Sequence, residues 1–575
     1  MIVETLPPGF LLWLGAALLP LLPQRLRGPA TILFPLLALV RVWGLTEGVH
    51  LSVPYLGQEL VLCQSDGLRR VFGMIFALIA VLGGIYSLHV RSLGQQAASL
   101  LYAGGGLVVA FSGDWLTLFL GWEVMAVASA CLIWARRTPE ASAAGLRYVL
   151  VHLLGGSLLL AGICLQVAET GSLAVTAFAP GASAAAWLAL AGVAVNVALP
   201  PLHAWLPDSY PKATATGSVF LSAFTTKTAV LVLALLFPGW GILVPLGVMM
   251  TLYGVTYAIL ANDIREVLAY HIVSQVGYMV AGVGIGTELG INGAAAHAYS
   301  HILYKALLFM GAGAVLETTG RTHMADLGGF ARRSPAVLVL YMVAAFSISG
   351  VPLFNGFISK SAVVAAAAET HRTISVVLLL LASVGTFLSV GLKLPYLTWF
   401  GPDRGIRPTK PPPNMLVAMG ITAFLCFLYG VWPDLLYRDL PYPMPYRPYT
   451  GAHLAEAIQL LLFTFLAFWW MRKKFAGERK ISLDTDWLYR RPGAAAAGLA
   501  VGAVNALFGA GERFAEGAAR GLAEAARNPA AVLGSRSSSP PPDPDRHRLP
   551  LGVSLALTLV ALVVLAVWGL LRLGA

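Results

Sequence analysis

Residues 198–229 read ALPPLHAWLPDSYPKATATGSVFLSAFTTKTA and contain the pattern that decides the fold. An apolar run at 184–199 precedes them, and Pro200 and Pro201 interrupt it, because proline inside a helix removes a hydrogen bond and clashes with the preceding turn. The chain then enters another apolar run at 218–238, with Lys227 near its middle. A lysine at that depth in a bilayer costs at least ~2.5–3.5 kcal/mol, so it is expected to face a polar interior. A broken helix beside a buried lysine indicates a path for ions or protons.

The composition places the chain in a membrane. Of its 575 residues, 58% are hydrophobic and only 11% are charged, and the mean hydropathy is +0.76. Soluble domains carry about 25% charged residues, so the chain is predicted to be a polytopic membrane protein. The net charge of +11 is spread over short loops instead of gathering on one face, which argues against nucleic acid as a partner.

Neither a cofactor nor a metal is expected. The chain has four widely separated cysteines: Cys63, Cys131, Cys164 and Cys426. They form no CxxC or CxxCH motif, which argues against iron–sulfur, haem and structural zinc sites. A metal bound by the His297–His301 pair is a weaker alternative, because no cysteine or acidic third ligand is evident nearby.

Sixteen apolar runs are long enough, or nearly long enough, to cross a bilayer. They lie near residues 9–23, 30–46, 70–90, 97–112, 115–134, 145–167, 184–199, 216–237, 241–261, 267–285, 292–316, 335–359, 373–399, 413–432, 452–471 and 550–571. The first follows Glu4 and no basic residue, which favours a retained helix over a signal peptide. The predicted fold class is an all-α polytopic membrane protein with about 16 transmembrane helices.

The loop charges predict the orientation of the chain. Loops after odd-numbered runs hold most of the basic residues, such as Arg136 and Arg137, whereas loops after even-numbered runs are nearly bare. The positive-inside rule therefore places the odd loops in the cytoplasm and both termini on the outer face.

Two of the runs are broken alike. The seventh breaks at LPPLHAWLP, and the twelfth breaks at SISGVPLFNGFISK, where Gly350, Pro352 and Gly356 precede Lys360. Each is the fourth member of a block of five runs, and an odd number of spans inverts the second block relative to the first. Inverted repeats with matched broken helices are a transporter architecture.

The chain divides accordingly into six segments. These are N-terminal transmembrane helices (1–96), a first five-helix repeat (97–238), a second, inverted repeat (239–400), two further transmembrane helices (401–471), a cytoplasmic segment (472–549) and a C-terminal transmembrane helix (550–575). Within the cytoplasmic segment, charges recur at mostly helical spacing over 494–527, which predicts an amphipathic helix on the membrane surface or on a partner. A polar, proline-rich linker, SRSSSPPPDPDRHR, follows it.

Ionisable residues inside the runs are the candidate functional residues, because such groups are rare in membranes and mark ion pathways. Glu123 lies in the middle of the fifth run and Lys227 in the eighth; the plainer alternative is a charge that a neighbouring helix satisfies. His297, His301 and Lys305 are spaced i, i+4 and i+8, so they share one helix face, where they can pass protons along a water chain.

Other ionisable residues have weaker signals. Lys360 and Lys393 lie at or near the ends of their runs, and a snorkelling side chain at the interface explains Lys393 equally well. His152 lies inside the sixth run, where packing is an equal alternative. Asp263 and Arg265 are expected to be loop and helix-capping charges.

Five stretches carry a family resemblance: PLHAWLPD, FTTKTAV, DIREVLAYHIVSQVGYM, AYSHILYKALLFMGAGAV and SGVPLFNGFISK. Together they resemble the antiporter-like, proton-pumping subunits of respiratory complex I and their Mrp-type relatives. The resemblance covers roughly residues 60–430. It is greatest to the D-type component of Mrp cation/proton antiporters and to similar subunits of membrane-bound hydrogenases. The surface helix and final span resemble those of the largest such complex I subunit, where a lateral helix straps neighbouring subunits together.

The resemblance implies a polar axis across the centre of the membrane. Its members here are Glu123, Lys227, His301, Lys305 and Lys360, with His152, His297, Lys393 and Asn196 as further candidates for the path. The family's seventh-helix lysine stands five residues before the proline of the PLH motif, and this position is Asn196. The lysine that the family pairs with its fifth-helix glutamate is therefore missing.

The prediction for function is an ion-translocating subunit of a larger complex in a bacterial cytoplasmic membrane. It would move protons, with exchange for Na⁺ or K⁺ left open, beside other antiporter-like and small membrane subunits. It would carry no redox site, so any NADH:quinone oxidoreductase or hydrogenase activity would belong to the complex. One alternative is a self-contained carrier for an organic solute, which leaves the buried ionisable groups of both blocks unexplained. Another is a structural subunit with a vestigial channel, to which Asn196 points.

The orientation can be tested with reporter fusions. Fusions after Arg137 and after Lys474 should both report a cytoplasmic location, because both follow odd-numbered runs. An external location for either one would mean that the number of spans upstream of it is wrong by one.

Overall fold

The computed structural model describes residues 6–181, 183–474, 483–527, 534 and 543–573. The chain forms two compact units, Met1–Asp486 and Trp487–Ala575. Within the described residues both units are helical except for one two-stranded sheet in the first.

The long helices of the first unit coincide with the predicted runs. They are α2 (Pro8–Leu18), α3 (Gln24–Trp43), α4 (Gly67–Tyr86), α5 (Leu93–Phe111), α6 (Trp115–Trp134), α7 (Pro139–Thr170), α8 (Ala184–Val197), α10 (Gly217–Ala223), α11 (Thr225–Leu236), α12 (Leu243–Leu260), α13 (Ile264–Ile285), α14 (Glu288–Thr319), α15 (Pro335–Ser349), α16 (Asn355–Glu369), α17 (Thr373–Thr386), α18 (Pro413–Val431) and α20 (Gly451–Met471). Short helical pieces join them: η1 (Leu19–Leu21), α9 (Trp205–Ser209), η2 (Tyr210–Lys212), η3 (Met324–Asp326), the π-helices η4 (Phe387–Lys393) and η5 (Tyr396–Phe400), α19 (Asp434–Tyr437) and η6 (Arg472–Lys474).

Thirteen helices among the described residues are long and apolar enough to cross a membrane. They include Asp486–Arg527 of the second unit, and three shorter apolar helices lie in the first. The helical, membrane-spanning character is therefore confirmed, while the number of sixteen spans and the inverted relation of the two repeats stay predictions.

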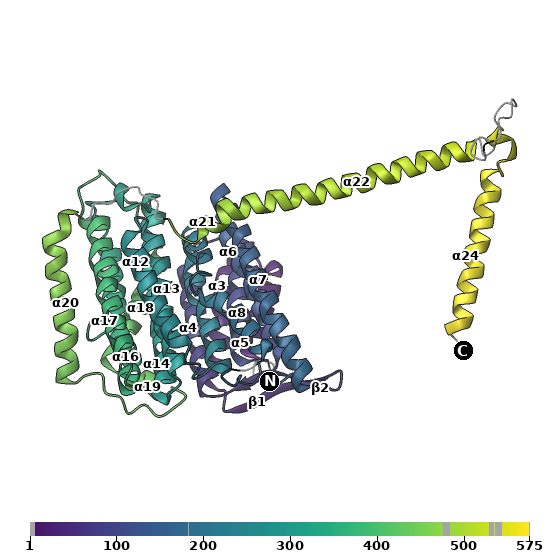
Figure 1. Ribbon diagram of the computed structural model, residues 1–575. Helices are drawn as coiled ribbons and strands as arrows, with labels where there is room; N and C mark the ends of the chain where they lie inside the picture. The colour runs from purple at the N-terminus through teal and green to yellow at the C-terminus, as the bar shows by residue number, and fades with distance from the viewer. Residues whose placement is uncertain (1–5, 182, 475–482, 528–533, 535–542, 574–575) are drawn as a thin grey trace. The chain divides into compact units, whose positions relative to one another are not determined.

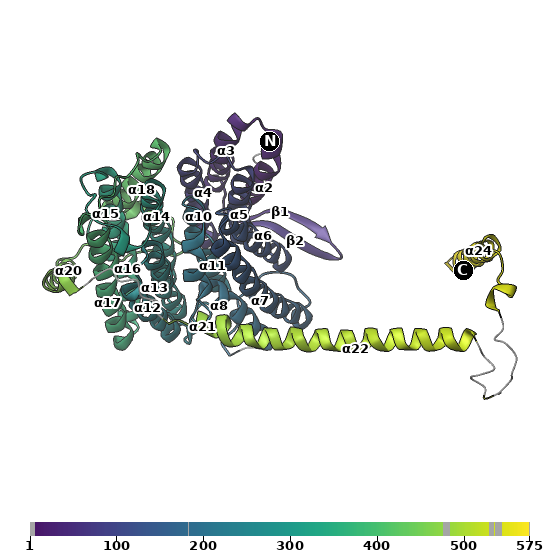
Figure 2. The same cartoon turned by 90° about the horizontal axis from the view of Figure 1, so that it is seen from above.

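The helices of the first unit run side by side in a bundle. In Figures 1 and 2 the helices α2 to α8 lie on one side, α12 to α18 lie on the other, and α20 lies at the edge. One continuous apolar core extends through both sides. Helix α14 contacts helices of both: α10 and α11 as well as α13 and α16. It is thus the element that joins the two predicted repeats.

The seventh run breaks before its prolines. Helix α8 ends at Val197, and Ala198 has a left-handed backbone with φ of 63°. The freed carbonyl of Val195 accepts hydrogen bonds from the Ala198 amide at 3.1 Å and the Trp205 indole at 2.9 Å. This carbonyl at the buried helix end is therefore satisfied by donors of the protein itself.

The twelfth run breaks between α15 and α16, where Gly350 has φ of 74°. Gly356 does not belong to the break, contrary to the expectation from the sequence, because α16 already begins at Asn355. A Cβ atom at Gly356 would lie 1.8 Å from the Ser347 carbonyl oxygen. Glycine is needed there so that α16 can start directly against the end of α15.

A third interruption was not predicted. The eighth run divides into α10 and α11 at Phe224, three residues before Lys227. Neither glycine nor proline stands at this point, so the sequence holds no local signal for it.

A β-hairpin between α3 and α4 was also not predicted. Strands β1 (Gly48–Tyr55) and β2 (Gln58–Ser65) pair antiparallel around a two-residue turn at Leu56 and Gly57, which both have positive φ. The Val61 carbonyl accepts a hydrogen bond from the Gly113 amide at 2.8 Å, which ties the hairpin to the start of α6.

The second unit contains α21 (Asp486–Leu488), the π-helix η7 (Tyr489–Gly493), α22 (Ala494–Arg527), the short η8 (Pro544–His547) and α24 (Leu551–Leu573). Helix α22 has 34 residues and none of them is buried. Its place on a membrane surface or a partner stays a prediction. Much of the predicted linker, residues 535–542, lies outside the described residues.

Candidate functional site

The centre of the candidate site is α14, which carries His297, His301 and Lys305. All three side chains are fully buried. Nδ1 of His297 lies 3.1 Å from the Ser359 hydroxyl of α16. Within the described part of the chain, both ring nitrogens of His301 and Nζ of Lys305 have no hydrogen-bond partner. Buried polar atoms without partners are costly, so this row of groups needs a reason beyond packing.

The charges of Lys227 and Lys305 act on His301, and those of Lys360 and Lys227 act on His297. The histidines of α14 are therefore influenced by the charge of a lysine of the first predicted repeat, Lys227, and by the charge of a lysine of the second, Lys360. The structure thus brings together four of the five predicted axis residues, all except Glu123.

Lys227 is fully buried and binds the end of α10. Its ammonium group donates to the Ser222 carbonyl at 2.5 Å and to the Thr226 hydroxyl at 3.0 Å. Ser222 lies in the last turn of α10, where the carbonyl oxygens carry the negative end of the helix dipole. The interruption at Phe224 supplies this site for the cation.

Two further lysines also bind the ends of helices. Lys360 donates to the Ile348 carbonyl at the end of α15 at 2.9 Å and to the Ser383 hydroxyl at 3.3 Å. Lys393 donates to the carbonyls of Ile259 and Ala261 at the end of α12, at 2.6 and 2.9 Å. Lys393 is only 4% exposed, so its ammonium group ends on these backbone carbonyls.

Glu123 lies apart from these cations. Its Oε1 atom rests over Gly156 of α7, where a Cβ atom would come within 2.2 Å of it. This oxygen has no hydrogen-bond partner among the described residues, and no cation of this part of the chain forms an ion pair with the carboxylate within 4.0 Å. Lys227 is therefore not a direct partner of Glu123, and the two could exchange charge only through intervening groups or water.

His152 lies on α7, one turn before Gly156, and Asn196 lies on α8, which packs against α7. The His152 ring stacks on Tyr148 at 3.9 Å and meets Trp205 edge-on at 4.5 Å, so it does pack. Yet Nε2 of His152 and Oδ1 of Asn196, like Oε1 of Glu123, lack partners among the described residues. Three neighbouring helices in the chain, α6, α7 and α8, thus each carry a buried polar atom without a partner in the described residues.

The sequence-based prediction missed His271, a further buried histidine near the predicted axis residues. Its side chain is fully buried on α13, with Nε2 2.6 Å from the Ser389 hydroxyl and Nδ1 without a partner in the described chain. The charges of Lys305 and Lys360 act on it. The i, i+4 spacing of His271 and Gln275, which is also buried, was the available signal.

Arg265 differs from its expectation. Asp263 caps α13 as predicted, accepting from the amides of Arg265 and Glu266. The Arg265 side chain, however, is fully buried and donates to four carbonyls of the segment after the broken helix: Tyr210, Pro211, Ala213 and Thr214. It fixes that segment against the second repeat.

Asp484, near the end of the first unit, lies in a buried polar cluster. Its carboxylate accepts from Tyr253 and, at 2.6 Å, from Tyr270, and it lies 3.2 Å from Nε2 of His203 in the broken helix. Burial acts to raise the pKa of Asp484, but the hydrogen bonds and charge of His203 and the two tyrosine hydroxyls outweigh it and hold the pKa below its usual range. Nearby, Thr485 donates to the Pro201 carbonyl at 3.3 Å.

The described residues contain no group of three or more His, Cys, Asp or Glu side chains that could hold a metal ion. Chemically, the site is a row of amines and imidazoles with one separate carboxylate, a set suited to moving protons.

The fold and site define a class: polytopic membrane proteins with interrupted helices around a buried ionisable axis. The family model described as NADH:quinone oxidoreductase/Mrp antiporter, TM matches residues 112–389. The chain is 30% identical to the D component of the Na⁺/H⁺ antiporter of Alkalihalophilus pseudofirmus, over 56% of this chain and 71% of that protein. It is also 30% identical to the N component of the NADH-quinone oxidoreductase of Desulforudis audaxviator, over 68% of this chain and 86% of that one.

A chain in the structure of the Mrp complex from Dietzia sp. DQ12-45-1b has the same fold. The TM-score is 0.69 at 21% identity, and the match covers 81% of this chain and 98% of that one. The protein belongs to the NADH:quinone oxidoreductase/Mrp antiporter family and is an integral membrane protein.

The Asp484 cluster predicts a pH-dependent stability. Asp484→Asn should lower the free energy of unfolding by ~1–3 kcal/mol, since it removes a charged acceptor from buried donors. A depressed pKa stabilises the fold above the unfolded value of about 3.9 and ceases to do so as pH falls through the folded value. The difference in Tm between the two proteins should therefore hold from about pH 8 to 5 and shrink below about pH 4.

Asp403→Asn is the matched control, because Asp403 pairs with Arg333 on the surface with 53% of its side chain exposed. It should change Tm little. Equal Tm values for wild type and Asp484→Asn at neutral pH would contradict the role given to the cluster.

Proposed function

We propose that this protein is a proton-translocating subunit of a multi-subunit membrane complex of the complex I-like or Mrp type. The observation that carries the proposal is the row of buried Lys227, His301, Lys305 and Lys360 side chains on α11, α14 and α16. Ionisable groups at membrane depth are expensive and are kept where ions or protons pass. Exchange of protons for Na⁺ or K⁺ is a further possibility within the same proposal.

The arrangement supports a relay in which each lysine alternates between a charged and a neutral form. Two unit charges ~4 Å apart interact by ~4 kcal/mol at an effective dielectric of about 20, so neighbouring ammonium groups oppose each other's protonation. A proton that arrives at one amine therefore favours release from the next. The helix ends that bind Lys227 and Lys360 stabilise the charged form of each while it waits.

Histidines connect the lysines in this relay. The charges of Lys227 and Lys305 act on His301, and the charges of Lys305 and Lys360 act on His271. An imidazole can accept a proton at one ring nitrogen and release one from the other. Lys393 of η4 binds the end of α12, and Ser389 of the same segment lies beside His271. This arrangement supports a path by which protons enter the row of lysines and histidines from the predicted cytoplasmic side.

The relatives support the assembly part of the proposal, since their names include an antiporter component and a quinone oxidoreductase component. We expect other antiporter-like and small membrane subunits as partners, in a bacterial cytoplasmic membrane with both termini outside. The exposed α22 offers a surface for such a partner. Any redox activity would reside in the other subunits.

Glu123→Gln tests the proton path. Glutamine keeps the volume and hydrogen-bonding capacity but cannot release a proton. We expect transport in proteoliposomes containing the complete complex to fall at least about tenfold, with assembly unchanged. Glu140→Gln, at an exposed carboxylate in the first turn of α7, is the control and should transport normally. Wild-type transport by a well-assembled Glu123→Gln complex would reduce Glu123 to a packing role.

The missing lysine gives a second test. Lys227→Met should abolish transport, because Lys227 is the buried ammonium that serves the first repeat. Asn196→Ala should leave much of the transport, since asparagine can bind water but does not titrate. Asn196→Lys should not simply improve it, because a second cation would repel Lys227. An inactive Asn196→Ala beside an active Lys227→Met would reverse the assignment and make Asn196 a specific ligand.

A further inference from the structure

A cavity of about 250 Å³ opens beside Lys360, between α16, α17 and α20. Its lining begins at Ser349 and Gly350 in the break of the twelfth run and reaches Ala368, in the last turn of α16, and Tyr446, in the segment before α20. From Lys360 to Ala368 the helix rises ~12 Å at about 1.5 Å per residue. The cavity therefore leads from the middle of the broken helix to the face of the membrane that carries residues 438–450.

The cavity has room and polar groups for water. A single water needs only about 10–15 Å³ of such space and two to four polar contacts. Three serines, Ser349, Ser361 and Ser383, contribute to the lining. Its titratable groups are Lys360 from α16, Tyr446 from the preceding segment, and His453 and Glu456 from α20.

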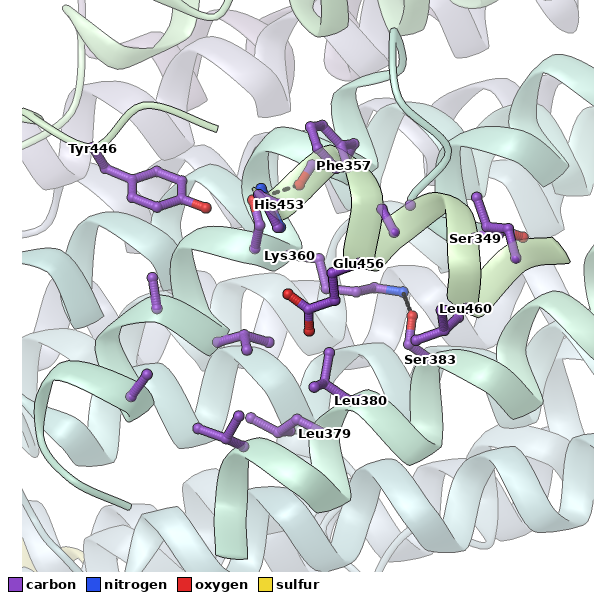
Figure 3. Close-up of a pocket in the computed structure, with 18 residues that line it drawn as sticks. Ser349, Phe357, Lys360, Leu379, Leu380, Ser383, Tyr446, His453, Glu456 and Leu460 are labelled. Carbon is purple, nitrogen blue, oxygen red and sulfur yellow. Dashed lines mark hydrogen bonds between the residues drawn. The ribbon is translucent and has the colours of Figure 1, made fainter. Parts of the chain in front are cut away.

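Lys360 and Glu456 both line this cavity. In Figure 3 the Lys360 ammonium points toward Ser383, to which it is hydrogen-bonded, and the Glu456 carboxylate points the other way in this view. His453 is already engaged, since Nδ1 lies 2.7 Å from the Pro448 carbonyl and the ring stacks on Phe357 at 4.8 Å. Within the described residues, the Glu456 carboxylate makes neither a hydrogen bond nor an ion pair. It is thus the acidic group of the lining that is available to a proton.

We propose that this cavity is the water-filled exit of the second repeat and that Glu456 accepts the proton that Lys360 releases. The proposal rests on the proposed function, in which Lys360 carries protons. The Lys360 ammonium gives one proton through water to the Glu456 carboxylate, which leaves a neutral amine and a neutral carboxylic acid. Glu456 then releases that proton to the solution, and Lys360 takes up the next one from the α14 groups.

Two observations favour this role over that of an incidental surface charge. Glu456 is the sixth residue of α20, an apolar helix that is long enough to span, and this exposed residue lines the cavity. Lys360 in turn is fixed by Ile348 and Ser383 so that its ammonium group stays at the wall of the cavity. Helix α20 lies outside the residues 112–389 that the family model matches.

The first experiment measures proton transport by the complete complex in proteoliposomes. Glu456→Gln should lower the rate about tenfold, less than the ~10²–10⁴-fold that a positioned proton-transfer group can contribute, because water partly replaces it. Glu456→Asp should keep most of the rate, since it keeps the carboxylate. Glu369→Gln is the matched control: it removes an exposed carboxylate at the outer end of α16 that does not line the cavity.

The outcomes separate this inference from the proposed function. Lys360→Met with little transport beside Glu456→Gln with wild-type transport would overturn the exit and leave the proposed function standing. Wild-type transport by Lys360→Met would overturn the proposed function itself. Equal losses in Glu456→Gln and Glu456→Asp would show a steric effect and would also overturn the role of the carboxylate.

A second experiment tests for water in the cavity. In a variant whose four cysteines are replaced by serine, Ala365→Cys places a thiol in the cavity lining, and Val377→Cys places one on α17 at a side chain that is 57% exposed on the outside of the bundle. A membrane-impermeant thiol reagent added on the side of residues 438–450 should label Ala365→Cys quickly, because the thiolate forms only where water is present. It should label the lipid-facing Val377→Cys slowly. Equally slow labelling of both would show a dry cavity and overturn the proposal.

Discussion

The interior of this protein depends on the pairing of lysine ammonium groups with carbonyl oxygens freed at helix ends. Lys227 binds Ser222 at the end of α10, Lys360 binds Ile348 at the end of α15, and Lys393 binds Ile259 and Ala261 at the end of α12. A buried ammonium group and a freed carbonyl oxygen are each costly when they have no hydrogen-bond partner. The pairing gives the ammonium group an acceptor and the carbonyl oxygen a donor. It also leaves each of these three cations on a neutral acceptor instead of on a carboxylate. A charge held in this way can be lost and regained without breaking an ion pair.

The two predicted repeats differ in the group that binds the carbonyl freed at the helix break. In the second, the break of the twelfth run is bound by a lysine, whereas in the first the freed Val195 carbonyl is bound by the Trp205 indole. Asn196 does not titrate, and Glu123 has no cation within ion-pair distance in the described chain. Lys227, one helix farther on, is the fully buried lysine of the first predicted repeat. Most of the buried lysines and histidines of the site therefore lie on the helices from α11 to α16.

The first repeat is also held against the second on one face. Arg265 of α13 binds the backbone carbonyls that follow the first break, and Asp484 connects His203 of that break to Tyr253 and Tyr270 of α12 and α13. A movement of the segment that carries His203 would thus displace the hydrogen-bonded groups of α12 and α13, in the second predicted repeat. Such contacts give a physical route for coupling the two halves, because hydrogen-bonded segments shift together.

The sequence by itself determined the membrane character, the position of nearly every helix, both proline- or glycine-marked breaks and the shared face of His297, His301 and Lys305. These follow from hydropathy, periodicity and backbone chemistry, which are properties of neighbouring residues. Tertiary structure alone decided the rest. The break at Phe224 has no local signal, the place of Glu123 over Gly156 depends on how α6 and α7 pack, and Asp484 meets His203 across 281 residues of chain. Contacts of this kind depend on the packed positions of distant helices, which no stretch of the sequence specifies alone.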